Sequence, residues 1–142
     1  MGRKEGDELL NALLPFARQM LEKHGAFHPF GAFVDQEGKI ALLGAYDGNE
    51  HPPAQTLIGM MVESLKVEAP KRGHRAIGIC FDVLVSLPGH SAKTDAIQVA
   101  IEYADGEAVD VYLPYRKNWL GKIRYGNLVA SRGEPKVFKG SS

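Results

Sequence analysis

The most constraining feature of the sequence is a regular alternation of apolar with polar or small residues between Arg75 and Tyr115. Successive side chains of a strand point to opposite faces of a sheet, so a period of two predicts strands. Three such runs follow one another with short connections, which favours an antiparallel sheet. Their apolar positions are Ile77, Ile79, Phe81, Val83 and Val85, then Ile97, Val99, Ile101 and Tyr103, then Val109, Val111, Leu113 and Tyr115.

The connection between the second and third runs sets their register. A three-residue loop over residues 104–106, with Gly106 in the left-handed position, places Ile101 opposite Val109. A two-residue turn would instead place Ile101 opposite Asp110. We therefore predict the three-residue loop.

Two other stretches have apolar residues at helical spacing. Residues 6–24 form an amphipathic pattern, and Pro15 inside it predicts a kink or two short helices in succession. A second helix is predicted to begin after Pro52 and Pro53 and to end at Gly73.

Between these helices, residues 30–45 contain two short apolar runs and predict a hairpin in which Asp35 pairs with Lys39. Both faces of this hairpin are apolar, and the two single-striped helices can share one face of the sheet. The other face then needs cover from the C-terminal segment or a second subunit. We therefore expect a homodimer with Phe33 and Leu43 in or near the contact.

The predicted order is helix, two strands, helix, three strands and a basic C-terminal segment. This order is typical of an α+β fold with two layers, in which helices pack on a five-stranded antiparallel sheet. We expect one domain over residues 1–142, with residues 115–142 packed on it. The same order resembles the profilin-like and roadblock-type folds. The stretches FHPFGAFVD, ICFDV and DVYLPYRK resemble small bacterial proteins of unassigned function, and that resemblance implies no activity.

The stretch GHSAKT contains partial matches to two catalytic motifs. A serine nucleophile elbow needs a glycine where Lys93 stands, and a phosphate-binding loop needs one where Ala92 stands. Both motifs also join a strand to a helix, whereas this stretch joins two predicted strands. We interpret it as a solvated hairpin loop in which Ser91 and Lys93 are contact residues at most.

Metal, thiol and cofactor chemistry have little support in the sequence. The five histidines are scattered, without the spacing that places two of them on one metal. Cys80, the single cysteine, excludes an internal disulfide and lies in an apolar run. No cofactor-binding loop is present, and no apolar stretch approaches the ~20 residues that cross a membrane. We expect a cytoplasmic protein with no cofactor, no metal and no membrane association.

Three carboxylates raise an enzymatic alternative. If the seven-residue loop 88–94 connects the first two alternating strands, then Asp82, Ala100 and Asp110 form one row, with Glu102 diagonal to them. Two strand spacings separate the aspartates by ~9.5 Å, near the upper limit for paired carboxylates in inverting glycosidases. The competing interpretation is a solvated polar row on the outer face.

Charge is distributed unevenly along the chain although the formal net charge is zero. Residues 115–142 hold seven Lys and Arg residues and one acidic residue, Glu134, interleaved with Trp119, Tyr125 and Phe138. Such a segment suits an anionic protein partner or single-stranded nucleic acid. The balanced total charge argues against nucleic acid. We also expect residues 115–138 to lie against the acidic remainder of the same chain or of a second copy.

These observations favour a non-catalytic binding or protein-interaction module, of an immunity or adaptor type, over an enzyme. The alternatives are a hydrolase that uses Asp82, Glu102 and Asp110, and a nucleic-acid binder that uses the C-terminal segment. The residues predicted for interaction are Phe33, Leu43, Tyr112, Arg116, Lys117, Trp119, Lys122 and Arg124.

Overall fold

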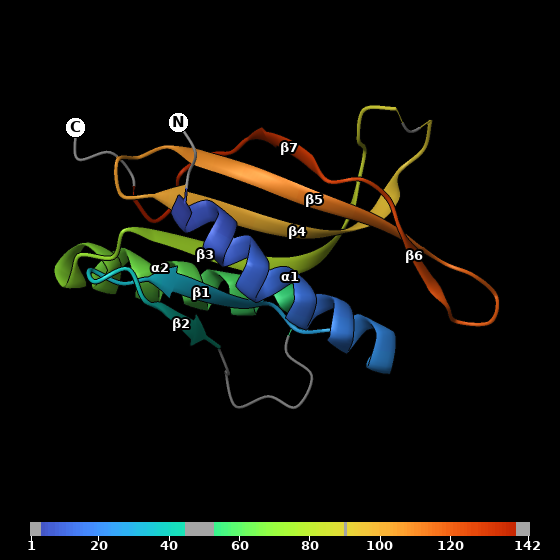
Figure 1. Ribbon diagram of the computed structural model, residues 1–142, viewed down its shortest axis with the longest axis horizontal. Helices are drawn as coiled ribbons and strands as arrows, with labels where there is room; N and C mark the ends of the chain where they lie inside the picture. Colours follow the sequence, from blue (N-terminus) through green and yellow to red (C-terminus); the bar gives the residue numbers. More distant parts are fainter. Residues whose placement is uncertain (1–3, 45–52, 90, 139–142) are drawn as a thin grey trace.

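The computed structural model describes residues 4–44, 53–89 and 91–138. Figure 1 shows its elements in chain order. These are α1 (Lys4–His24), β1 (Phe30–Val34), β2 (Ile40–Leu43), α2 (Ala54–Arg72), β3 (Ala76–Val85), β4 (Thr94–Tyr103), β5 (Ala108–Lys117), β6 (Ile123–Tyr125) and β7 (Val129–Arg132). The strands form one seven-stranded antiparallel sheet in the order β2-β1-β3-β4-β5-β6, and β7 also pairs with β5. The predicted α+β class is confirmed, with seven strands in place of five.

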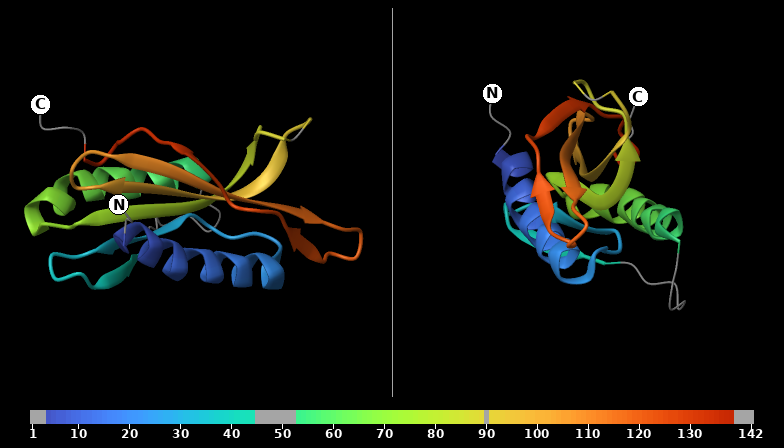
Figure 2. Two further views of the ribbon diagram at one scale, coloured as in Figure 1. Left: turned by 45° about the horizontal axis from the view of Figure 1, so that its top comes forward. Right: turned by 90° about the vertical axis from the view of Figure 1, so that its right-hand side faces the viewer.

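The two helices cover opposite faces of the sheet (Figure 2). On one face, Leu13 of α1 belongs to the same buried cluster as Val99 of β4. On the other, Met61 of α2 belongs to a second cluster with Ile77 of β3. The arrangement is therefore helix, sheet, helix and not the two layers predicted. The reason lies in β3, whose residues 76–80 are all buried and so need apolar cover on both faces.

Short glycine-containing turns fix two of the registers as predicted. Ile101 lies opposite Val109, and Gly106 has a φ of 93°. In the first hairpin, the Asp35 N–H donates to the Lys39 carbonyl at 2.8 Å. The β3–β4 register differs from the prediction, because the ladder extends to Val85 and Thr94 and the connection is longer than the predicted loop.

The helix limits agree closely with the sequence pattern. α1 is a single helix that continues through Pro15, so of the two predicted alternatives, a kink or two short helices, the second is wrong. α2 starts directly after Pro53 and ends at Gly73, whose φ of 67° places it in the left-handed region. Of the helices in the described ranges, none is long and apolar enough to cross a membrane.

The basic C-terminal segment contributes two strands to the sheet. β6 pairs with the end of β5, from Tyr115 to Lys117, whereas β7 pairs with residues 109–112 nearer its start. After β7, residues 133–138, which we call the strap, turn back over the α2 face. The Val137 side chain is buried there in the cluster that contains Met61.

Candidate functional site

The three predicted carboxylates are divided between the two faces of the sheet. Asp82 lies opposite Ile97, on the α1 face, where the Tyr115 hydroxyl donates to its Oδ1 at 2.7 Å. Burial raises the pKa of Asp82, and the hydrogen bond from Tyr115 opposes that rise. Asp110 lies opposite Ala100 on the other face. The predicted row is therefore wrong for Asp82, because the longer β3–β4 connection shifts the register and turns its side chain over.

Glu102 and Asp110 do share the α2 face, but Glu102 has a structural role. Its side chain is 5% exposed, and its Oε1 accepts hydrogen bonds from the backbone N–H groups of Val137 at 2.8 Å and Phe138 at 3.0 Å. A buried carboxylate needs such donors. Glu102 therefore anchors the strap and does not serve as the second free carboxylate that the hydrolase alternative requires beside Asp110.

Asp110 borders a hollow of about 400 Å³ between α2, the sheet and the strap. Burial raises the pKa of this half-buried carboxyl, while a side-chain hydrogen bond from Gln98 and the charge of Lys136 lower it. We call this hollow the α2 groove. It is bounded by Ile58 and Val62 of α2, Ile79 and Phe81 of β3, Asp110 of β5 and Lys136 of the strap.

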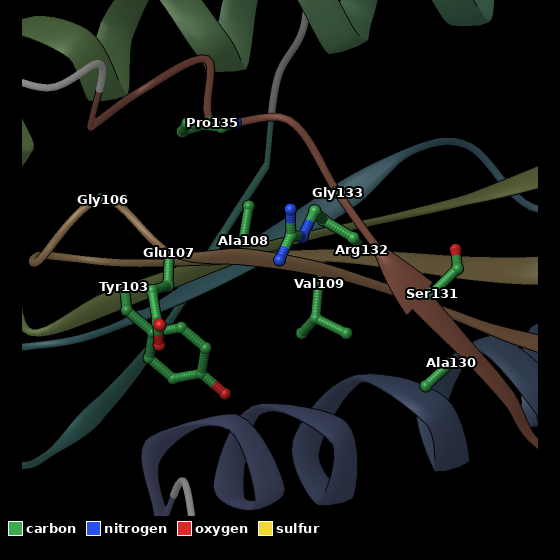
Figure 3. Close-up of a pocket in the computed structure, with 10 residues that line it drawn as sticks. All are labelled: Tyr103, Gly106, Glu107, Ala108, Val109, Ala130, Ser131, Arg132, Gly133 and Pro135. Atoms are coloured by element: carbon green, nitrogen blue, oxygen red, sulfur yellow. The ribbon is translucent and has the colours of Figure 1, made fainter.

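A larger hollow of about 710 Å³ lies where β7 runs beside the β4–β5 hairpin. Figure 3 shows that its lining side chains diverge: Tyr103 and Val109 point toward α1, whereas Ala108 points away from it. The hollow wraps around the edge of the sheet, and its polar groups do not converge on a common centre. We therefore do not regard it as the candidate site.

The predicted basic and aromatic residues gather on the β5–β6 hairpin. Arg116 pairs directly with Arg124, and Lys117 pairs with Ile123. At the tip, the Trp119 side chain is 90% exposed. The hairpin therefore presents the exposed Trp119 ring at its tip and basic side chains along its two strands.

The turn that carries Trp119 is held by its own hydrogen bonds. Asn118 Oδ1 accepts from the N–H groups of Leu120 at 2.9 Å and Lys122 at 3.0 Å. The Asn118 N–H donates to the Lys122 carbonyl at 2.9 Å, and Gly121 has a φ of 82°. Because these hydrogen bonds fix the backbone of the turn, less conformational freedom is lost when Trp119 contacts a partner.

One side of the hairpin is attached to the end of α1. Lys117 Nζ donates to the Gly25 carbonyl at 2.6 Å, and the Tyr125 hydroxyl donates to Glu22 Oε2 at 2.7 Å. The Arg18 guanidinium lies 4.3 Å from the centre of the Tyr125 ring. Burial and Glu22 together raise the pKa of Tyr125 to about 12. These contacts leave Arg116 and Arg124 on the opposite side, where both are exposed.

The remaining interaction candidates are half-buried and contact other parts of the chain. Phe33 stacks on His74 with ring centres 3.9 Å apart, and Leu43 packs against the cluster beneath α2. Tyr112 is half-buried and shares a side-chain hydrogen bond with Ser131. α2 thus covers the face of the β1–β2 hairpin that was expected to need a second subunit.

Sequence reasoning missed His74, because a single histidine after a helix carries no distinguishing pattern. Its ring is 4% exposed, and its Nδ1 finds no hydrogen-bond partner in the described part of the chain. Burial lowers the pKa of His74. Cys80 is fully buried, and burial raises its thiol pKa, as expected for an unreactive cysteine.

The described ranges hold no group of three or more His, Cys, Asp or Glu residues that could bind a metal ion. Protein-family models, curated proteins and solved structures give no match to this chain. The β5–β6 hairpin and the α2 groove are the two candidate sites of this chain.

Proposed function

We propose that the protein is a non-catalytic protein-interaction module of the immunity or adaptor type, which binds an acidic protein partner through the β5–β6 hairpin. We place this activity in a bacterial cytoplasm. The observation that carries the proposal is the 90% exposure of Trp119 on a hydrogen-bonded turn. Tryptophan and arginine are the residues most enriched among those that dominate binding energy at protein interfaces.

The paired arginines support an anionic partner. Arg116 and Arg124 lie side by side on neighbouring strands, an arrangement that like-charge repulsion disfavours in the free protein. A carboxylate between them would relieve this repulsion and form charge-assisted hydrogen bonds. Leu120 beside Trp119 is 62% exposed and extends the apolar tip, which suits a protein pocket better than stacked bases.

Trp119 provides the test, because it is the only tryptophan in the chain and its fluorescence reports on the hairpin alone. A partner captured from bacterial lysate and purified should shift this emission to the blue and protect it from iodide quenching. Trp119→Ala should weaken binding by about thirtyfold or more. Leu128→Ala removes another exposed apolar side chain, outside the tip, and should bind as the wild type does.

Two results would contradict the proposal. One is unchanged affinity of the partner for Trp119→Ala. The other is an equal emission shift with a single-stranded oligonucleotide at physiological salt, which would favour the nucleic-acid alternative.

A homodimer is a second candidate, with a contact different from the one predicted. Among the described residues β2 pairs with β1 alone, and its Ile40 and Leu42 side chains are 36% and 62% exposed. Exposed apolar edge strands readily pair with another chain. Light scattering should find a dimer that Leu42→Lys converts to a folded monomer. The matched change Leu43→Lys, beneath α2, should destabilise the fold instead.

A further inference from the structure

The α2 groove has two sides of different chemistry. Its apolar side consists of Ile58 and Val62, one helical turn apart on α2, together with Ile79 and Phe81 on the sheet. Its polar side is formed by β4, β5 and the strap. The volume of about 400 Å³ lies within the range of pockets that bind small organic molecules.

Asp110 is held on the floor of the groove by a rigid part of the fold. It lies near the start of β5, between Ala100 on β4 and Ser131 on β7. Gly133 packs closely against the carboxylate, since a Cβ at that position would lie 3.3 Å from Asp110 Cγ. Groups positioned by strands in this way are fixed more accurately than groups on loops.

The charges around the groove differ in how strongly they act on a bound molecule. Arg132, Glu134 and Lys136 are exposed at the rim, where water and salt screen them. Glu102 is buried, but its carboxylate already accepts two backbone N–H groups. Asp110 is half-buried, and in the described part of the chain the Gln98 side chain donates to it while the charge of Lys136 also acts on it. Of the groove's acids, Asp110 therefore gains most from a further hydrogen-bond donor.

We propose that the α2 groove binds a small organic amine. The ammonium group donates hydrogen bonds to Asp110, and the apolar body packs against Ile58, Val62 and Phe81. A ligand carboxylate in this place would meet Asp110 in a partly buried site, where like charges repel strongly. The groove therefore selects cations over anions and zwitterions of the same shape. None of the residues that line the groove lies between Arg116 and Arg124, the part of the hairpin proposed to bind a protein, so the two proposals can fail separately.

Three probes with one aromatic body and different charges test this selection. Phenethylamine is a cation, phenylalanine adds a carboxylate to it, and hydrocinnamate is the corresponding anion. In nitrogen-edited NMR titrations at neutral pH, phenethylamine should shift the backbone signals of Ile79, Gln98 and Ala100. Hydrocinnamate should bind about tenfold more weakly or worse, the factor expected for loss of a charged hydrogen bond. Phenylalanine keeps the ammonium group but should also bind more weakly, because Asp110 repels its carboxylate.

Matched variants identify the group responsible. Asp110→Asn keeps the shape of the side chain and should weaken phenethylamine binding by about tenfold or more. Asp82→Asn, on the opposite face, should leave it unchanged. If Asp110→Asn does not fold, a second variant serves the same purpose. Val62→Phe fills the apolar side of the groove and should abolish the chemical-shift change of Ile79 on addition of phenethylamine.

Three outcomes would overturn the proposal. They are equal binding of hydrocinnamate or phenylalanine, unchanged affinity of a folded Asp110→Asn variant, and the absence of shifts in the groove with phenethylamine.

Discussion

Arg116 and Arg124 lie directly opposite each other on β5 and β6, so one cross-strand position holds two like charges. We expect Arg124→Glu to raise the free energy of unfolding by up to about 1 kcal/mol, because an opposite-charge pair replaces the repulsion. The same change should weaken partner binding. Urea denaturation measures the first effect, and Trp119 fluorescence measures the second.

Arg132→Glu is the control for this effect. Arg132 lies opposite the uncharged Val109, so its change should leave stability within about 0.5 kcal/mol of the wild type. Equal stabilisation by both variants would mean that general charge balance, and not the cross-strand pair, is responsible.

Removing the anchor of the strap should have a large and local effect. Glu102→Ala leaves the buried N–H groups of Val137 and Phe138 without their acceptor, so it should lower the free energy of unfolding by about 1.5–3 kcal/mol. Glu102→Gln keeps a carbonyl acceptor and should lower the free energy of unfolding by a smaller amount. Hydrogen exchange should accelerate at residues 137 and 138 in Glu102→Ala, and unchanged exchange there would contradict the anchoring role.

His74 should make the fold sensitive to mild acid. Its folded-state pKa is lowered from 6.5 by burial and by Arg72, although Asp35 and Glu68 oppose this shift. The unfolded chain therefore takes up a proton at higher pH than the folded chain, and stability should fall as pH decreases below 6.5.

His74→Phe tests this pH dependence, because it preserves stacking on Phe33 and removes the titrating group. Urea midpoints measured across the acidic range should fall more steeply for the wild type than for the variant. If the urea midpoints of both proteins fall equally steeply with decreasing pH, groups other than His74 account for the acid sensitivity.

Two glycines of this chain should respond to alanine in opposite directions. A Cβ at Gly31 would lie 2.7 Å from the Gly78 carbonyl oxygen, so Gly31→Ala forces the β1 and β3 backbones apart. It should destabilise the protein by about 1–3 kcal/mol. Gly59 lies within α2, and a Cβ added there would meet nothing within 4 Å, so Gly59→Ala should stabilise by up to about 1 kcal/mol. Thermal denaturation compares the two.

Short turns made the fold predictable where they contain glycine at a fixed position. Gly38 and Gly106 both have positive φ, and the registers beside them were predicted correctly. The β3–β4 connection also contains a glycine with positive φ, Gly89, but this connection is long enough for several loop lengths to be compatible with the alternation. Its register was therefore wrong, and with it the face of Asp82.

The hairpin tip was only partly predictable for a related reason. Composition identified Trp119 and the surrounding basic residues. The strands β6 and β7 were missed because, with three and four residues, they are too short to show an alternation of apolar and polar side chains. The α2 groove could not be predicted, because it depends on which face α2 covers. The buried run 76–80 of β3 was the available signal for cover on both faces.

The late position of the strap has a consequence for synthesis on the ribosome. Every fully buried residue of the α1 cluster lies between Leu9 and Tyr115, so that face can be completed before the strap emerges. The α2 cluster still lacks Val137 at that stage, and Glu102 lacks both of its donors. A nascent chain therefore has one finished face and one unfinished face, and translation of the strap completes the second.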